Sequence, residues 1–434
     1  MSPAPRALVA LALWLVTGIV AAIAPALTGA WLAVGVGVGL ALALDALWLW
    51  RLPPPEVERH VPVALSIGSW TAVRLRFANP GSLRLRLRVY DHHPARSRTR
   101  GLPLRLELSP GRREECVYRL WPETRGRHRF GQVELRLRSA IGLFERHLRV
   151  GEPEDVRVYP NFRAAAGYEL LAAENRTGVL GIRRRPRRGE GLEFHQLREY
   201  RAGDALRQID WKATARLRRP ISREYQDERD QQVIFLLDCG RRLHAKDGER
   251  SHFDRALDAL LLLAHVAIRQ GDSVGLLTFS GEPRWLAPRK GVGQLNALLN
   301  AVFDLETSTR SVDFQSAARE LALRAPRRAL IVLITNVRDE DTEELVPSLR
   351  LLSKRHLVLL ASLREGVLAE TLRSPVRNFE SALRVGSVHR YLEDRARGLQ
   401  SAARCGALLL DCESDELTAQ LVNGYLDVKA SGVL

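Results

Sequence analysis

The chain has 434 residues and a formal net charge of +16, from 66 basic against 50 acidic residues. This length leaves room for two or three domains that each bury a sizeable core, and the spacing of the four cysteines excludes a zinc finger. The charge favours an anionic partner, which could be the inner leaflet of a membrane, nucleic acid or an acidic protein.

Two apolar runs open the chain and predict a transmembrane helical hairpin over residues 1–52. The run from Ala7 to Ala24 carries no charge, and the run from Ala30 to Trp50 carries only Asp45. Each is close to the roughly 20 residues that cross a bilayer. Because Arg6 and Arg51 flank an uncharged turn, the positive-inside rule predicts an inner-membrane protein whose termini and later domains are cytoplasmic. Asp45 and the glycines before it leave open a further role in contacts with a partner helix.

Residues 53–160 alternate apolar and polar side chains, which is typical of strands with one buried face. The alternation is clearest over Leu83 to Val89, Leu102 to Leu108 and Val133 to Leu137. Turn signals separate these short segments, such as the Asn-Pro-Gly that starts at Asn79. The pattern predicts a β-sandwich of immunoglobulin-like type.

Residues 161–231 form a connecting segment with the most distinctive motif of the chain. Its charges are interleaved with aromatic side chains, which favours a semi-buried network of ion pairs and hydrogen bonds that fixes the segment to the first strand of the next domain. A basic loop, Arg183 to Arg188, precedes the motif and could be solvated or could bind acidic lipid or an acidic partner. The motif consists of Arg198, Glu199, Tyr200, Gly203, Asp204, Arg207, Asp210, Trp211, Lys212 and Arg216.

This motif resembles the signature of a bacterial family known as domain of unknown function fifty-eight. The resemblance extends from the N-terminal hairpin to about Asp411. It implies a membrane-anchored protein with a von Willebrand factor A-like domain, often encoded beside MoxR-type AAA+ ATPases. Because the family has little assigned biochemistry, the resemblance predicts architecture more than activity.

Residues 232–434 alternate strand and helix patterns. Continuous apolar strands separated by amphipathic helices predict a parallel sheet covered on both faces, in an α/β Rossmann-like fold that the resemblance specifies as von Willebrand A-like. Ligands bind such sheets at the C-terminal ends of the strands, where Asp238, Ser280 and Asn336 fall. The expected strands are Val233 to Leu237, Ser273 to Phe279, Ala329 to Thr335, His356 to Ser362 and Ala407 to Leu410.

The resemblance also implies a divalent-cation site built on an Asp-x-Ser-x-Ser motif, and this chain departs from it. The first aspartate corresponds to Asp238, but the serine positions carry Gly240 and Arg242, and Asn336 replaces a later aspartate. Hard cations need several oxygen ligands, and Arg242 adds a positive charge. We therefore expect a degenerate site with no metal and no other cofactor, in which Asp238 pairs with Arg241, Arg242 or a residue of the motif.

The sequence carries no enzyme signature. It has no glycine-rich phosphate loop and no Walker A lysine, and no base is evident beside Cys239. We predict a membrane-anchored, non-enzymatic protein-interaction module without a small-molecule substrate. By resemblance its partner is a MoxR-type AAA+ ATPase, and the pair acts in protein maturation or complex assembly.

Two alternatives stay open. The first is a metal-dependent hydrolase or nuclease that uses His195, Asp204, Asp210 and Asp238. The second is a membrane-tethered nucleic-acid binder that uses the arginine excess, although no aromatic side chain interrupts the basic loop.

Overall fold

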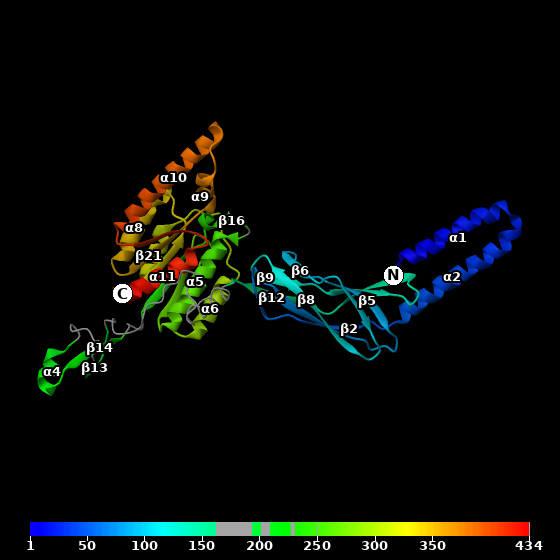
Figure 1. Cartoon of the computed structure of the whole chain (residues 1–434), viewed down its shortest axis with the longest axis horizontal. Coiled ribbons are helices and arrows are strands. Elements are labelled where there is room, and N and C mark those ends of the chain that lie inside the picture. Colours follow the sequence, from blue (N-terminus) through cyan, green and yellow to red (C-terminus); the bar gives the residue numbers. More distant parts are fainter. Residues whose placement is uncertain (162–192, 201–208, 227–230, 249, 434) are drawn as a thin grey trace. The chain divides into compact units, whose positions relative to one another are not determined.

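The computed structural model describes residues 1–161, 193–200, 209–226, 231–248 and 250–433. They belong to two units, Met1–Tyr159 and Pro160–Leu434. The first unit holds two apolar helices and a β-rich part, and the second unit holds a mixed α/β domain (Figure 1).

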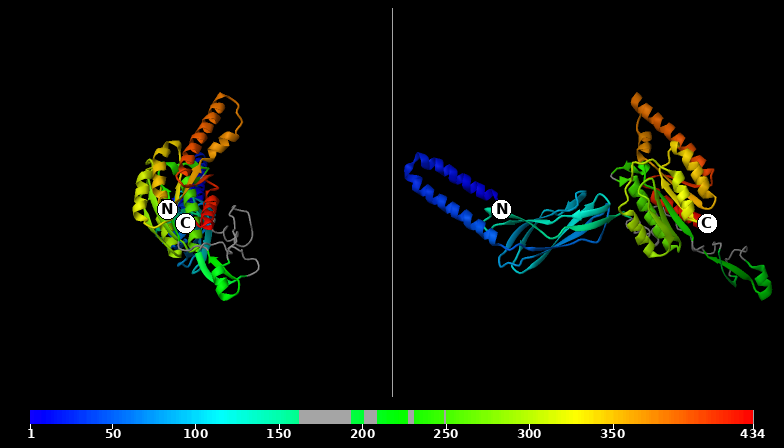
Figure 2. Two further views of the ribbon diagram at one scale, coloured as in Figure 1. Left: turned by 90° about the vertical axis from the view of Figure 1, so that its left-hand side faces the viewer. Right: turned by 180° about the vertical axis from the view of Figure 1, so that it is seen from behind.

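Two N-terminal helices, α1 (Pro5–Ile23) and α2 (Thr28–Arg51), lie side by side and are joined by a short 3-10 turn, η1 (Pro25–Leu27) (Figure 2). Both are long and apolar enough to span a membrane, and only 11% of each apolar window is buried. Apolar side chains that face outward along a whole helix fit a lipid environment better than water.

A reciprocal tryptophan pair joins the two helices. The rings of Trp14 and Trp31 stack with centroids 5.0 Å apart, and each indole N–H donates to the backbone carbonyl of the other residue. Glycines make room for the rings, since a Cβ on Gly35 would lie 2.7 Å from Trp14 Nε1 and one on Gly18 would lie 3.0 Å from Trp31 Nε1. Gly35 therefore serves the hairpin itself.

The β-rich part is built from strands whose alternate residues are buried. In β4, Val73, Leu75 and Phe77 are 0–1% exposed, whereas Arg74 and Arg76 between them face solvent. The five-stranded sheet β1-β11-β10-β5-β7 and the four-stranded sheet β2-β4-β8-β6 contribute to one apolar core, together with the smaller sheet β3-β12-β9. The strands are β1 (Ser2–Pro3), β2 (Glu56–His60), β3 (Ala64–Ser66), β4 (Thr71–Ala78), β5 (Leu85–Asp91), β6 (Ser97–Arg100), β7 (Leu104–Leu108), β8 (Arg113–Pro122), β9 (Gly126–Phe130), β10 (Val133–Arg138), β11 (Phe144–Val150) and β12 (Glu154–Tyr159).

Asp45, the charge within α2, is 3% exposed and binds the loop between β10 and β11. Its carboxylate accepts hydrogen bonds from Ser139 Oγ at 2.6 Å and from the backbone N–H groups of Ile141 and Leu143 at 3.3 and 3.1 Å. The partner of this charge is thus the chain's own loop. The last turns of α2 pack on the β-rich part, and Leu49 is fully buried in its core.

The second unit contains a six-stranded sheet in the order β19-β18-β15-β20-β21-β22. Its strands are parallel except for β19, which pairs antiparallel with β18, so the sheet is mixed rather than wholly parallel. The strands are β15 (Gln232–Asp238), β18 (Ser273–Phe279), β19 (Trp285–Arg289), β20 (Leu330–Thr335), β21 (Leu357–Arg364) and β22 (Leu408–Glu413), and the short strands β16 (Lys246–Asp247) and β17 (Arg250–Ser251) form a separate pair.

Helices cover both faces of this sheet. Side chains of α5, α6 and α11 join the core on one face, and those of α7, α8 and the end of α10 join the core on the other. Alternate residues of β15 enter the two cores, which explains why this strand is apolar without interruption. The helices are α5 (His252–Arg269), α6 (Val292–Val302), α7 (Phe314–Arg324), α8 (Thr342–Ser353), α9 (Gly366–Arg373), α10 (Phe379–Ala403) and α11 (Leu417–Ser431), with the 3-10 turns η3 (Arg241–His244) and η4 (Asp339–Asp341).

The strand order reverses at β15. The chain passes from β15 to β18 on one side and later returns to β20 on the other. The C-terminal ends of β15 and β20 therefore meet at a topological switch point, which is where open α/β sheets bind ligands.

Candidate site at the C-terminal edge of the sheet

Asp238 ends β15 at the switch point, and its side chain is fully buried. Thr335 Oγ1, at the end of β20, donates to one carboxylate oxygen at 2.7 Å, and the backbone N–H of Gly240 donates to the other at 2.8 Å. Burial is the largest influence and raises the pKa of Asp238 to about 6, against the two hydrogen bonds that lower it. Among the described residues no salt bridge joins Asp238 to Arg241, Arg242 or the motif, and Arg242 instead pairs with other carboxylates, although its charge still acts to lower the pKa of Asp238.

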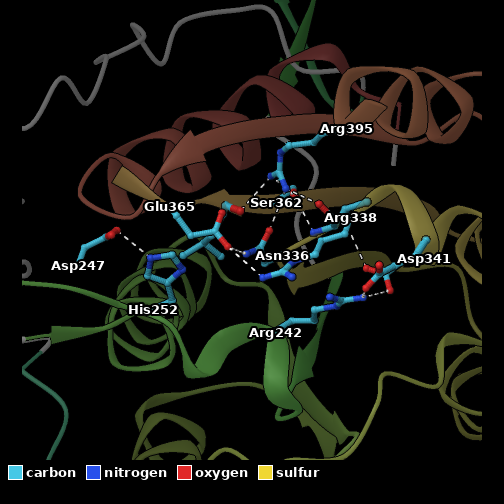
Figure 3. Close-up of polar contacts among 12 residues, drawn as sticks. Arg242, Asp247, His252, Asn336, Arg338, Asp341, Ser362, Glu365 and Arg395 are labelled. Atoms are coloured by element: carbon cyan, nitrogen blue, oxygen red, sulfur yellow. Dashed lines mark hydrogen bonds and ion pairs between the residues drawn. The ribbon is translucent and has the colours of Figure 1, made fainter. Parts of the chain in front are cut away.

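Arg242 binds two acidic residues further along the chain. Its side chain is 4% exposed, and its guanidinium donates to the carboxylates of Glu340 and Asp341 in η4 (Figure 3). The hydrogen bond from Arg242 is the main cause that lowers the pKa of Glu340. Asp341 also accepts from the backbone N–H of Arg338 at 3.0 Å, so this ion pair fixes the turn that follows β20.

A second charged network lies at the ends of β20 and β21. Arg395 of α10 is 1% exposed and donates to Asn336 Oδ1 at 2.8 Å, Ser362 Oγ at 2.6 Å and Asp411 Oδ1 at 2.8 Å. Asn336 in turn donates to Glu365 at 2.8 Å. Figure 3 shows the side chains of Arg395, Ser362, Asn336 and Glu365 converging. Asn336, predicted as a lost metal ligand, is therefore a connector between an arginine and a glutamate.

Glu365 and Asp247 fix the start of α9. Glu365 directly precedes α9 and accepts from Arg338 at 3.4 Å, while Asp247 accepts from the Gly366 N–H at 3.1 Å and from His252 Nε2 at 2.7 Å. Burial acts to raise the pKa of Asp247, but its hydrogen bonds outweigh burial and leave it below the ordinary value.

The donor set at this edge does not resemble that of a hard cation site. The oxygens of Asp238 are occupied, Gly240 offers no side chain and Arg242 brings a positive charge. A Cβ on Gly240 would lie 3.0 Å from both Asp238 Oδ1 and Ser280 Cβ, so a serine there would crowd its neighbours. Among the residues that the structure describes, no group of three or more His, Cys, Asp or Glu side chains is placed to hold a metal. The absence of a metal stays a prediction.

Arginines line a small pocket beside these networks. Arg241, Arg242, Arg338 and Glu340 surround a volume of about 190 Å³. The pocket places guanidinium groups beside the carboxylate of Glu340 at the switch point.

The described part of the sequence motif folds as a hairpin with a helical insert, formed by β13 (Glu193–Glu199), α4 (Trp211–Leu217) and β14 (Ile221–Gln226). Asp210 caps α4 by accepting from the Ala213 N–H at 3.0 Å. Glu199 pairs with Arg219, and both side chains are more than half exposed.

The predicted semi-buried network was therefore wrong for several of its members. Trp211 is 70% exposed, and Lys212 and Arg216 are also exposed, because the helix that carries them buries no residue. Arg198 donates to the backbone carbonyl of Glu199 at 3.1 Å. Gly203, Asp204 and Arg207 lie outside the described residues, as does the loop from Arg183 to Arg188.

The structure tests only part of the residue set proposed for a hydrolase. Asp204 and the side chain of His195 lie outside the described residues. Asp210 caps α4, and Asp238 is buried at the end of β15, in a different sheet. The two described carboxylates thus serve separate local structures.

Sequence reasoning missed Arg395, although a signal was present. Leu392, Arg395, Leu399 and Ala402 follow helical spacing, and Arg395, Leu399 and Ala402 are all buried. A buried arginine within an apolar helix face needs several hydrogen-bond acceptors. The loops that follow strands at a sheet edge can supply them.

Residues 196–378 match the family described as "Protein of unknown function DUF58". Over 232 residues the chain is 22% identical to the uncharacterized protein YeaD of Bacillus subtilis, covering 52% of this chain and 54% of that protein. It is 26% identical over 243 residues to the uncharacterized protein Rv1480 of Mycobacterium tuberculosis, covering 52% and 76%. The matched stretch thus spans about half the length of YeaD.

Among solved structures, proximal thread matrix protein 1 from the mussel byssus is similar at 10% identity and a TM-score of 0.31, covering 47% of this chain and 46% of that chain. A TM-score this low does not establish a shared fold. The family match and the two bacterial relatives confirm the family resemblance, and residues 196–378 of the chain match the DUF58 family of proteins of unknown function.

Proposed function

We propose that the chain is a membrane-anchored, non-enzymatic module that docks a protein partner at the C-terminal edge of its α/β sheet. The observation that carries this proposal is that the charged side chains of the edge bind one another. The Asp238 carboxylate accepts hydrogen bonds from neutral donors, and the Arg242 guanidinium pairs with two acidic residues. An edge held rigid by buried charges suits recognition better than catalysis, which needs an accessible acid, base or nucleophile.

The helical arm formed by α9 and α10 supplies an apolar contact surface at the same edge. It follows β21 directly, and α9 and α10 lie side by side and extend beyond the sheet (Figure 1). Phe379 is 84% exposed and Leu383, one turn later, is 61% exposed. Exposed aromatic and aliphatic side chains at helical spacing fit an apolar groove on a partner.

By family resemblance we propose a von Willebrand A-like role for this domain and a MoxR-type AAA+ ATPase as the partner, in protein maturation or complex assembly. The two apolar helices support a place in the inner membrane. The arginines that flank the hairpin support cytoplasmic domains.

Affinity purification of the tagged full-length protein from its native membranes tests this proposal. Quantitative mass spectrometry should recover a MoxR-type ATPase with the wild type and at least about tenfold less with the double variant Phe379→Ala, Leu383→Ala, since each buried side chain contributes roughly 1.5–3 kcal/mol. The control is Leu323→Ala in α7, which removes another leucine that is 85% exposed. Failure to recover such an ATPase with the wild type would count against the partner, and equal recovery with all variants would count against the arm.

The hydrolase or nuclease alternative predicts a stoichiometric divalent cation, which elemental analysis of the purified protein would detect. The nucleic-acid alternative predicts binding to DNA that weakens steeply with salt. Neither result is expected under the docking proposal.

A further inference from the structure

A cavity of about 500 Å³ lies where the end of α2 meets the β-rich part of the first unit. One wall is the last turns of α2, including Leu44, Leu47 and Trp48. The other wall is the connection from β4 to β5, including Ser82 and Leu83. Figure 1 shows α2 ending at these strands.

The apolar wall of the cavity is continuous with the outward surface of α2. Leu40, Leu44 and Leu47 follow helical spacing and are 59%, 57% and 42% exposed, and Leu83 across the cavity is 43% exposed. Four exposed leucines at this place form an apolar strip that leads from the proposed membrane span into the cavity.

Residues with polar side-chain donors line the same cavity. They are Arg51, Trp48 and Ser82. A guanidinium, an indole N–H and a hydroxyl form a donor set suited to a phosphate group.

The length of α2 places these donors at headgroup level. About 20 residues from Thr28 span roughly 30 Å of hydrocarbon, which brings the membrane boundary near Leu47 and leaves Trp48 and Arg51 just beyond it. Tryptophan and arginine favour this depth.

The cavity has a fixed shape because both walls are held in place. Asp45 binds the loop after β10, and Arg146 Nη1 donates to the carbonyls of Trp50 and Leu52 at 3.2 and 2.9 Å. On the other wall, Asn79 Nδ2 donates to the Leu83 carbonyl at 2.8 Å. A preformed site loses little conformational entropy when it binds a ligand.

We propose that this cavity binds a membrane phospholipid, with its phosphodiester at Arg51, Trp48 and Ser82 and one acyl chain along Leu44, Leu47 and Leu83. The proposal rests on the membrane span of α1 and α2 and is independent of the docking function of the α/β domain. A bound lipid would fill the angle between the helix and the strands and stiffen their junction.

Native mass spectrometry of the full-length protein in detergent, titrated with phosphatidylglycerol, tests the site. The wild type should retain one lipid. Arg51→Gln should weaken retention by at least about tenfold, as expected for loss of a charge-assisted hydrogen bond, and Ser82→Trp should abolish it by filling the cavity while Arg51 stays in place. The control Arg88→Gln removes an exposed arginine of β5 outside the cavity and should retain lipid as the wild type does.

Equal retention by all four proteins would overturn the proposal. Displacement of the lipid by glycerol phosphate at similar concentration would also overturn it, because it would identify a site for a soluble anion. Unchanged circular dichroism melting of Ser82→Trp separates a filled cavity from a misfolded protein. Loss of lipid by Arg51→Gln together with retention by Ser82→Trp would place the lipid elsewhere on α2 and would refute the cavity.

Discussion

Replacing Arg395 by leucine should destabilise the C-terminal edge of the sheet, so that its strands open locally more often. The arginine side chain is 1% exposed and donates five hydrogen bonds, to Asn336, Val337, Ser362, Leu363 and Asp411. A leucine leaves all five acceptors without this donor, and two of them are backbone carbonyls. Removing one partner of a buried charge pair costs about 3–5 kcal/mol.

The expected loss lies at the lower end of that range. The Asp411 side chain is 29% exposed, so water replaces part of what the guanidinium supplied. A loss of about 3 kcal/mol corresponds to a roughly hundredfold larger opening equilibrium for β20, β21 and β22. Hydrogen–deuterium exchange of the peptides from these strands measures that equilibrium in the full-length protein.

Arg397→Leu is the matched control for this experiment. Arg397 lies on the same helix but is 75% exposed and pairs with Asp394, so its loss should leave exchange unchanged. Arg395→Lys should give an intermediate result, because one ammonium keeps the charge but cannot reach Asn336 and Asp411 together. If Arg395→Leu exchanged no faster than Arg397→Leu, the network would not hold the edge.

Three further predictions follow from buried or crowded groups. Asp238→Asn should remove a pH dependence of up to about 3 kcal/mol from the free energy of unfolding. The wild type loses this stability as the pH rises from about 4 through the raised pKa of about 6. Thermal melts of both proteins at pH 4.5 and 7 measure the difference. Gly35→Ala should disrupt the ring of Trp14 and change tryptophan fluorescence, whereas Gly37→Ala, with nothing within 4 Å, should not. Asp45→Leu leaves two backbone N–H groups without an acceptor and should speed proteolysis of the loop after β10.

The layout of the α/β sheet follows from apolar runs that the sequence displays. Ser273 to Phe279 was predicted as a strand and is β18, because all of its residues are buried between two helix layers. The short helix α9 was not predicted, since eight residues without a side-chain cap give little periodic signal. The sequence from Pro283 to Pro288 predicts a short hairpin extension, and the structure has the antiparallel edge strand β19 there.

The sequence did not predict which side chains pair with one another at the site. The predicted strand ends placed Asp238 and Asn336 at one edge of the sheet, because parallel strands share one C-terminal edge. They did not predict that Arg242 binds residues 98 and 99 positions later, in a turn after another strand. Several carboxylates lie within reach of such an arginine, and only the loop geometry decides among them.

The buried networks limit where a partner can act on this edge. Asp238 accepts hydrogen bonds within the domain and Arg242 and Arg395 pair with carboxylates there, so a partner that competed for them would have to break buried hydrogen bonds. Exposed groups carry no such cost. Under the docking proposal, affinity should therefore respond to the side chains of the helical arm, such as Phe379, while the buried networks set the rigidity of the surface that presents them.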